Sequence, residues 1–158
     1  MNRKIANLGK HFFCFALGST VACCYEKRKK QGNKIDDKDK KARQLFDNWL
    51  VLAERETKIE EYFHQKKIQK VAVYGYADIG NHLTVQLADT DIEVRYVIDK
   101  RPCSPPEGIA WYRPTDELPY VDAVIITPVW EYTQIKETIR RKVSGQILSM
   151  EDIVYELL

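Results

Sequence analysis

The segment over residues 70–80 carries the clearest chemical signal in the chain. A short apolar run leads there into a turn bounded by two glycines, and a helical pattern follows. A turn of this kind presents backbone N–H groups at a helix N-terminus, which is a favourable place for a phosphate group. We therefore expect a nucleotide-binding turn made of six residues, namely Gly75, Tyr76, Ala77, Asp78, Ile79 and Gly80.

The turn departs from the complete glycine pattern of dinucleotide-binding domains. Its middle position is Ala77, where the usual glycine lets the backbone approach a pyrophosphate closely. Asp78 adds a carboxylate near the phosphate position, although a carboxylate there also suits the positive end of a helix dipole. Two interpretations stay open: a phosphate site, or a turn whose glycines serve the fold alone.

Two further groups of residues follow apolar runs that predict strands. Asp99 comes about 20 residues after the turn, a spacing that suits a carboxylate bound to ribose hydroxyls. Lys100 and Arg101 follow it and could instead bind a 2′-phosphate. Thr127 and Pro128 leave a later strand at the same edge of the predicted sheet, where they would border the same ligand. NAD(P) or a nucleotide-sugar is the cofactor or ligand that such a site would take.

The remaining chemical motifs do not define a catalytic site. Tyr132 and Lys136 match the spacing of the catalytic pair of short-chain dehydrogenases, but three other Tyr/Lys pairs in this chain have the same spacing. The four cysteines, at positions 14, 23, 24 and 103, are not spaced as zinc ligands, and we interpret them as reduced thiols. We assign no catalytic residue and no metal ligand, and independent catalysis is not favoured.

The elements that must position the turn alternate between strand and helix. The sequence predicts strands over residues 71–74, 94–98, 109–112, 121–126 and 146–149, and helices over 79–87, 130–142 and 150–158. Several of these strands are continuous apolar runs, as expected for strands buried on both faces. With right-handed crossovers, the alternation predicts an α/β, Rossmann-like fold with a parallel sheet of about five strands in the order 3-2-1-4-5.

A helical arm is predicted before the sheet. Leu45, Trp49 and Leu52 recur at helical spacing in a helix that begins near residue 36. Residues 57–60, Thr-Lys-Ile-Glu, predict a capping box that opens a second, short helix. We expect the aromatic residues of both helices to pack against the sheet; they are Phe46, Trp49, Tyr62 and Phe63.

Charge divides the chain. Residues 1–70 hold 17 Lys and Arg against 9 Asp and Glu, whereas residues 71–158 hold 8 against 14. We therefore divide the chain into a basic and apolar N-terminal segment with its linker (1–35), the helical arm (36–67) and the Rossmann-like nucleotide-binding domain (68–158).

The N-terminal segment contains an apolar run over residues 12–25 with basic residues on both sides. This run is shorter than the about 20 residues that span a bilayer. It could pack on protein, lie at a membrane interface or act as an export signal. We expect a cytoplasmic protein in which residues 1–35 make a peripheral contact with the inner face of the membrane or with a protein partner, and we expect no nucleic-acid partner.

Six short motifs occur between residue 49 and the end of the sequence. They are Trp49-Leu50, Tyr62-Phe63 and the runs over residues 74–80, 98–100, 121–127 and 149–153. Together they resemble a small Rossmann-like family of bacteria, whose members occur beside or fused to glycosyltransferases and sugar-modifying enzymes of cell-surface polysaccharide synthesis. The resemblance covers roughly two thirds of the chain.

The resemblance implies a function as well as a fold. We expect an accessory or regulatory protein of polysaccharide biosynthesis that binds a nucleotide or a nucleotide-sugar. One alternative is an NAD(P)-dependent oxidoreductase subunit that acts on a sugar nucleotide, with a partner supplying the substrate domain. The other is a ligand-free interaction module that docks a glycosyltransferase.

Overall fold

The computed structural model describes residues 36–158, and residues 1–35, with the apolar run 12–25, lie outside the described residues. A helix covers residues 36–54 at the start of the described part. Residues 41–158 form one compact unit. The further elements are α2 (Glu60–Lys66), β1 (Lys70–Tyr74), α3 (Asp78–Leu87), β2 (Glu93–Ile98), β3 (Ala110–Tyr112), β4 (Ala123–Ile126), the 3-10 helix η1 (Val129–Glu131), α4 (Tyr132–Ile139), β5 (Gln146–Ser149) and α5 (Met150–Leu157).

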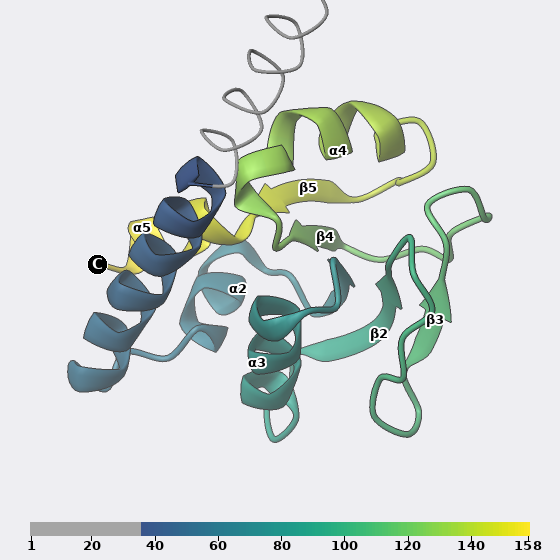
Figure 1. Ribbon diagram of the computed structural model, residues 1–158. Coiled ribbons are helices and arrows are strands. Elements are labelled where there is room, and N and C mark those ends of the chain that lie inside the picture. Colours follow the sequence, from purple (N-terminus) through teal and green to yellow (C-terminus); the bar gives the residue numbers. More distant parts are fainter. Residues whose placement is uncertain (1–35) are drawn as a thin grey trace, which may run out of the picture. The chain divides into compact units, whose positions relative to one another are not determined.

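The five strands form one all-parallel sheet in the order β3-β2-β1-β4-β5 (Figure 1), which confirms the predicted α/β fold and strand order. In the central strand, Val73 pairs with Val97 of β2 on one side and with Ile125 of β4 on the other. All four residues of β4 are buried, as are residues 71–74 of β1. Continuous apolar runs form these strands because helices cover both faces of the sheet.

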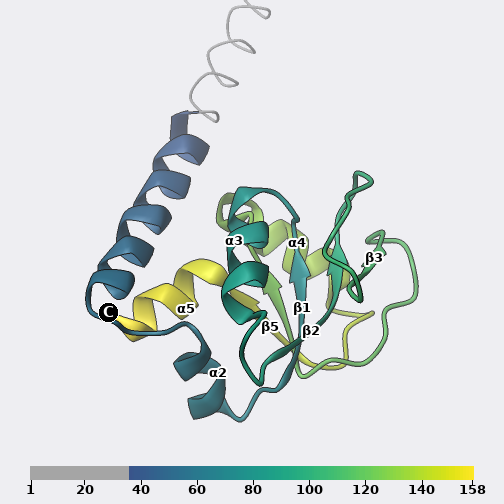
Figure 2. The ribbon, with the colours of Figure 1, turned by 90° about the horizontal axis from the view of Figure 1, so that it is seen from below.

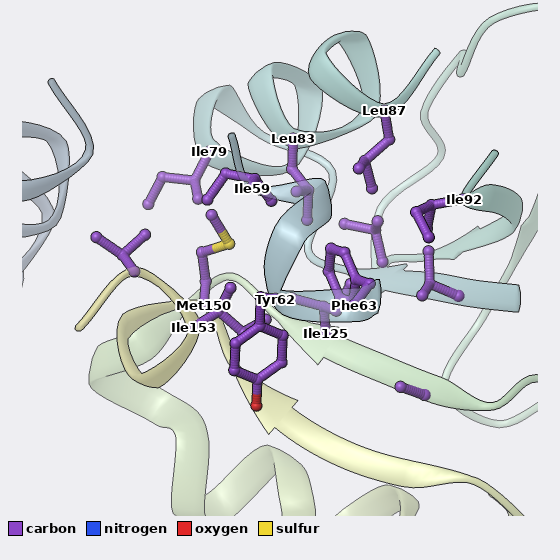
Figure 3. Packing of buried hydrophobic residues seen from close by; sticks show 14 of the residues in the cluster. Ile59, Tyr62, Phe63, Ile79, Leu83, Leu87, Ile92, Ile125, Met150 and Ile153 are labelled. Carbon is purple, nitrogen blue, oxygen red and sulfur yellow. The ribbon is translucent and has the colours of Figure 1, made fainter. Parts of the chain in front are cut away.

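Alternate residues of each strand supply two separate hydrophobic cores. Val71 and Val73 belong to the larger core, which α2, α3, α5 and the helix over 41–54 complete. Ala72 and Tyr74 belong to the smaller core on the opposite face, where α4 packs. Figure 2 shows α3 in front of the strands and α4 behind them. Figure 3 shows the larger core, in which Phe63 is fully buried.

The helix over residues 41–54 packs on this larger core through the predicted apolar stripe. Leu45, Trp49 and Leu52 are buried. The indole Nε1 of Trp49 donates a hydrogen bond of 3.0 Å to Oε1 of Gln86 on α3. Phe46 is half-buried against the same core. The predicted core positions of all four aromatic residues are therefore confirmed, with Tyr62 and Phe63 buried in α2.

The predicted capping box at residues 57–60 is wrong. Helix α2 begins after Ile59, which makes no side-chain capping bond, and Oε1 of Glu61 accepts the Lys58 N–H at 3.2 Å. Thr57 instead closes the preceding helix, because its N–H donates to the Leu52 carbonyl at 2.9 Å while Glu56 has φ of +60°. This is a Schellman ending, which ties Thr57 to the helix before it.

Other boundaries differ by smaller amounts. The helix predicted over residues 130–142 is split into η1 and the shorter α4, since the chain leaves β4 through Pro128 into a 3-10 turn. β4 begins at Ala123 and β3 at Ala110, two residues and one residue later than predicted. β5 has the predicted bounds, and the Ser149 side chain caps α5 by accepting the Glu151 N–H at 3.3 Å.

Asp122 ties the amino ends of β1 and β4 together. Its Oδ2 accepts the backbone N–H groups of Lys70 at 2.8 Å and Gln69 at 3.0 Å, and its Oδ1 accepts the Tyr120 hydroxyl at 3.0 Å. These bonds hold the pKa of the Asp122 carboxyl below its ordinary value of 3.8. The bonds from the Lys70 and Gln69 backbone contribute most to this lowering. The ionised Asp122 carboxylate therefore stabilises the folded state, and this contribution is lost when the carboxylate is protonated.

We expect Asp122→Asn to lower the free energy of unfolding by about 1–2 kcal/mol at neutral pH. A depressed folded-state pKa gives stability that is present above pH 3.8 and lost as the pH falls through the lower folded value. The difference between wild type and variant should therefore shrink below pH 3.8. Urea denaturation at neutral and acidic pH measures this, with exposed Glu117→Gln as the control. A pH-independent difference would contradict the assignment.

Candidate functional site

The candidate site lies at the carboxyl edge of the parallel sheet. The turn that follows β1 and the loop that follows β4 leave neighbouring strands there, at the point where the strand order reverses. In open parallel sheets, ligands bind outside the carboxyl ends of the strands at such a topological switch point. The structure brings the predicted turn 75–80 together with Asp99, Thr127 and Pro128 at this edge.

Gly75 adopts a backbone conformation that favours glycine, with φ of +91°. Its N–H donates to the Ile98 carbonyl at 2.8 Å, which joins the turn to the end of β2. A Cβ atom built on Gly75 would lie 2.7 Å from Cδ of Pro128 and 2.8 Å from Oγ1 of Thr127. The Thr127 hydroxyl, which is buried, lies 2.7 Å from the Gly75 carbonyl oxygen and donates to it. Thr127 and Pro128 therefore hold the turn in place.

Gly80 has a different reason to be glycine. It is buried in the first turn of α3, and a Cβ atom built on it would lie 2.2 Å from the Gly75 carbonyl oxygen. The missing side chain lets α3 approach the turn and β1 closely, as the last glycine of dinucleotide-binding turns does. Neighbouring Ile79 packs into the larger core and anchors the helix start.

The N-terminus of α3 faces solvent. Ala77 is the N-cap residue, and it is exposed and makes no side-chain capping bond. Asp78, the first helical residue, is exposed as well. The first N–H groups of an α-helix have no acceptor within the helix, so an N-cap without a side-chain acceptor leaves them available to an anion.

The Asp99 carboxylate is directed at the glycine turn. Its Oδ2 accepts the Tyr76 N–H at 2.9 Å, and its Oδ1 accepts the Arg101 N–H at 2.9 Å. The indole Nε1 of Trp111, on β3, donates to the Asp99 backbone carbonyl at 3.3 Å. Asp99 thus links the loop after β2 to the turn after β1, whereas Lys100 beside it is exposed.

Sequence reasoning missed two ionisable groups that flank Asp99. Burial, and then the carboxylates of Asp99 and Glu131, raise the pKa of the Tyr74 phenol. Burial, and then Asp99, raise the pKa of the half-buried Cys103 thiol. This edge of the sheet therefore favours the neutral thiol and phenol, which does not suit a thiolate nucleophile. Cys103 follows Asp99 by only a few residues in the sequence, and this short separation could have indicated that the thiol lies near the site.

Tyr132 and Lys136 form a local contact on α4. The Tyr132 hydroxyl donates to the Ile147 carbonyl of edge strand β5 at 3.1 Å, and Nζ of Lys136 lies 3.3 Å from the same hydroxyl. The hydrogen bonds of these two side chains go to β5 and to each other, and none goes to the glycine turn. In residues 36–158, no group of three or more His, Cys, Asp or Glu side chains is placed to hold a metal ion. Over the same residues, no helix has both the length and the apolar character to cross a bilayer.

The fold and the site together define a doubly wound, Rossmann-like α/β domain with a glycine turn at its switch point. Comparison of the chain with protein-family models, with curated proteins and with solved structures found no match.

Proposed function

We propose that this protein binds a nucleotide or a nucleotide-sugar at the glycine turn, as an accessory or regulatory protein of cell-surface polysaccharide biosynthesis. The observation that carries the binding proposal is the contact between Asp99 and the turn, in which a carboxylate oxygen lies 2.9 Å from the Tyr76 nitrogen beside the exposed N-terminus of α3. N–H donors suited to a phosphate and a carboxylate acceptor suited to ribose hydroxyls are thereby adjacent. The biosynthetic context rests on the sequence resemblance described above.

Each part of the site would have a distinct role. The N–H groups at the start of α3, over residues 77–80, would bind a phosphate. The Asp99 carboxylate has lone pairs beyond those used by Tyr76 and Arg101, and these would accept the ribose hydroxyls. The exposed side chain of Lys100 would add a positive charge on the solvent-facing side of the site. The proposal places the protein in the cytoplasm, where such ligands are made available to biosynthetic enzymes.

A second candidate function is a ligand-free interaction module. The specific observation in its favour is that packing alone accounts for both glycines, since a Cβ atom would clash with Pro128 at Gly75 and with the Gly75 carbonyl oxygen at Gly80. In that case the turn serves the fold, and the protein acts through its surface.

A thermal-shift assay on the full chain separates the two functions. At a ligand concentration of 100 times its dissociation constant, the folded state gains about 2.7 kcal/mol. We therefore expect a rise of several degrees in the melting temperature with at least one of NAD, NADP, a UDP-sugar and a CDP-sugar. A melting temperature that none of these ligands moves would contradict the binding proposal and favour the interaction module.

If a nicotinamide nucleotide is the ligand, we expect NAD to bind more tightly than NADP, because the Asp99 carboxylate repels a 2′-phosphate. Asp99→Asn should weaken NAD binding about tenfold and reduce the preference over NADP. Asp122→Asn is the matched control, since that carboxylate also accepts two backbone N–H groups but lies at the amino edge of the sheet. Titration at one ionic strength measures both affinities, and tighter binding of NADP by the wild type would refute the ribose assignment.

A further inference from the structure

A groove lies between the helix over residues 41–54 and α3, and it includes none of the predicted site residues. It consists of two adjoining hollows of about 560 Å³ and 320 Å³. Trp49, Ala53 and Gln86 line both hollows, so the two adjoin at these residues. The hydrogen bond from Trp49 to Gln86 joins the two helices at these shared residues.

The smaller hollow is apolar. Leu50 and Val85, on the two opposing helices, are 59% and 61% exposed and line it together. They are two of the few large hydrophobic side chains that are this exposed in residues 36–158. Phe46 also lines this hollow, packs against the larger core and contacts the His82 ring edge-on, at 5.9 Å between centroids. Leu50 and Val85 are thus gathered at one hollow instead of being scattered singly, which is a feature of protein-binding surfaces.

The larger hollow carries negative charge. Glu56, Glu60 and Asp89 line it with a single basic residue, Lys58, which pairs with Glu60 at 3.5 Å. Helix α3 ends at this hollow with no basic residue in its last turn, so the negative end of its dipole adds to the field. The groove is therefore apolar at one end and anionic at the other.

We propose that this groove docks an amphipathic helix of a partner protein, with an apolar stripe that covers Leu50 and Val85 and with Lys or Arg residues placed over Glu56 and Asp89. A groove whose walls are two helices suits a third helix better than an extended strand, which would need an open sheet edge. Charge complementarity selects a basic partner. A second copy would bring the same anionic surface against itself in an isologous contact, which costs binding energy.

Fluorescence anisotropy with a labelled model peptide tests the proposal on the full chain. The probe is a peptide of Leu and Lys alone, with Leu at i, i+3, i+4 and i+7. We expect this peptide to bind at least about tenfold more tightly than a peptide of the same composition whose Leu residues do not form a stripe. Replacement of the Lys residues of the striped peptide by Glu should weaken its binding by a similar factor.

Variants locate the binding surface. Leu50→Ser with Val85→Ser should weaken binding of the probe about tenfold, since both side chains are exposed and their loss leaves the core intact. Glu56→Gln with Asp89→Asn should weaken binding and reduce its salt dependence. The matched control is Tyr155→Ser on α5, where Tyr155 is 74% exposed. Circular dichroism verifies that each variant is folded.

Three outcomes would overturn the proposal. The first is equal binding of the striped and unstriped peptides, and the second is binding that the Leu50 and Val85 substitutions leave unchanged. The third is a homodimer, seen by analytical ultracentrifugation, that the same two substitutions dissociate, because the surface would then belong to a second copy. None of these outcomes depends on nucleotide binding at the glycine turn.

Discussion

Replacement of Gly75 by alanine is expected to lower the free energy of unfolding by about 2–5 kcal/mol. The backbone at Gly75 has φ of +91°, which costs an L-residue about 1–2 kcal/mol. The new Cβ would also lie 2.7 Å from Cδ of Pro128, so the loop after β4 must move away from the turn. Urea denaturation measures the loss, and the thermal shift produced by a nucleotide should disappear with it.

Gly108 provides a matched control for this prediction. Its φ is +88°, nearly the same as that of Gly75, but a Cβ atom built there would meet nothing within 4 Å. Gly108→Ala should therefore show the conformational cost alone, about 1–2 kcal/mol. Equal losses in the two variants would show that the contact with Thr127 and Pro128 adds nothing to the stability of the turn.

We expect Gly80→Ala to destabilise the domain by about 2–4 kcal/mol, opposite in sign to the usual effect of this substitution in a helix. Alanine in place of a helical glycine ordinarily gains about 0.5–1 kcal/mol. At Gly80 the new Cβ would lie 2.2 Å from the Gly75 carbonyl oxygen, which is backbone and cannot rotate away. Helix α3 must then shift from β1 and carry its N-terminal N–H groups with it.

Asn81→Ala is the control for Gly80→Ala. It also raises helix propensity at an exposed neighbouring position, and it removes only a hydrogen bond of 3.2 Å from the Tyr76 hydroxyl. Its stability should stay within about 0.5 kcal/mol of wild type. If thermal or urea denaturation found Gly80→Ala as stable as wild type, the close approach of α3 to the turn would not be a constraint on the sequence.

Local patterns in the sequence determined much of the fold. The strand β5 has its predicted bounds, and Ser149 caps α5, because the signal for a strand end and a helix cap lies within a few residues. The continuous apolar runs of β1 and β4 predicted burial on both faces, which the structure confirms. The handedness of crossover connections then determined the strand order, since it allows few arrangements of alternating strands and helices.

Helix ends depended on neighbours that local patterns do not reveal. Thr57 has the residue type of an N-cap, yet its N–H closes the preceding helix on Leu52, because two helices compete for the same few residues. The helix after β4 begins at Tyr132, later than its pattern predicts, since Pro128 packs near Gly75 and the chain first makes a 3-10 turn.

The glycine turn was apparent from the sequence, but its surroundings were decided by the tertiary structure. Asp99 was predicted to meet a ribose from its spacing, and its bond to the Tyr76 N–H joins residues 23 positions apart. Thr127 reaches the Gly75 carbonyl across 52 positions. Such contacts arise because parallel strands bring their carboxyl ends to one edge whatever lies between them in the chain. Residue type and local spacing therefore determine which elements form, and sheet pairing determines which side chains meet.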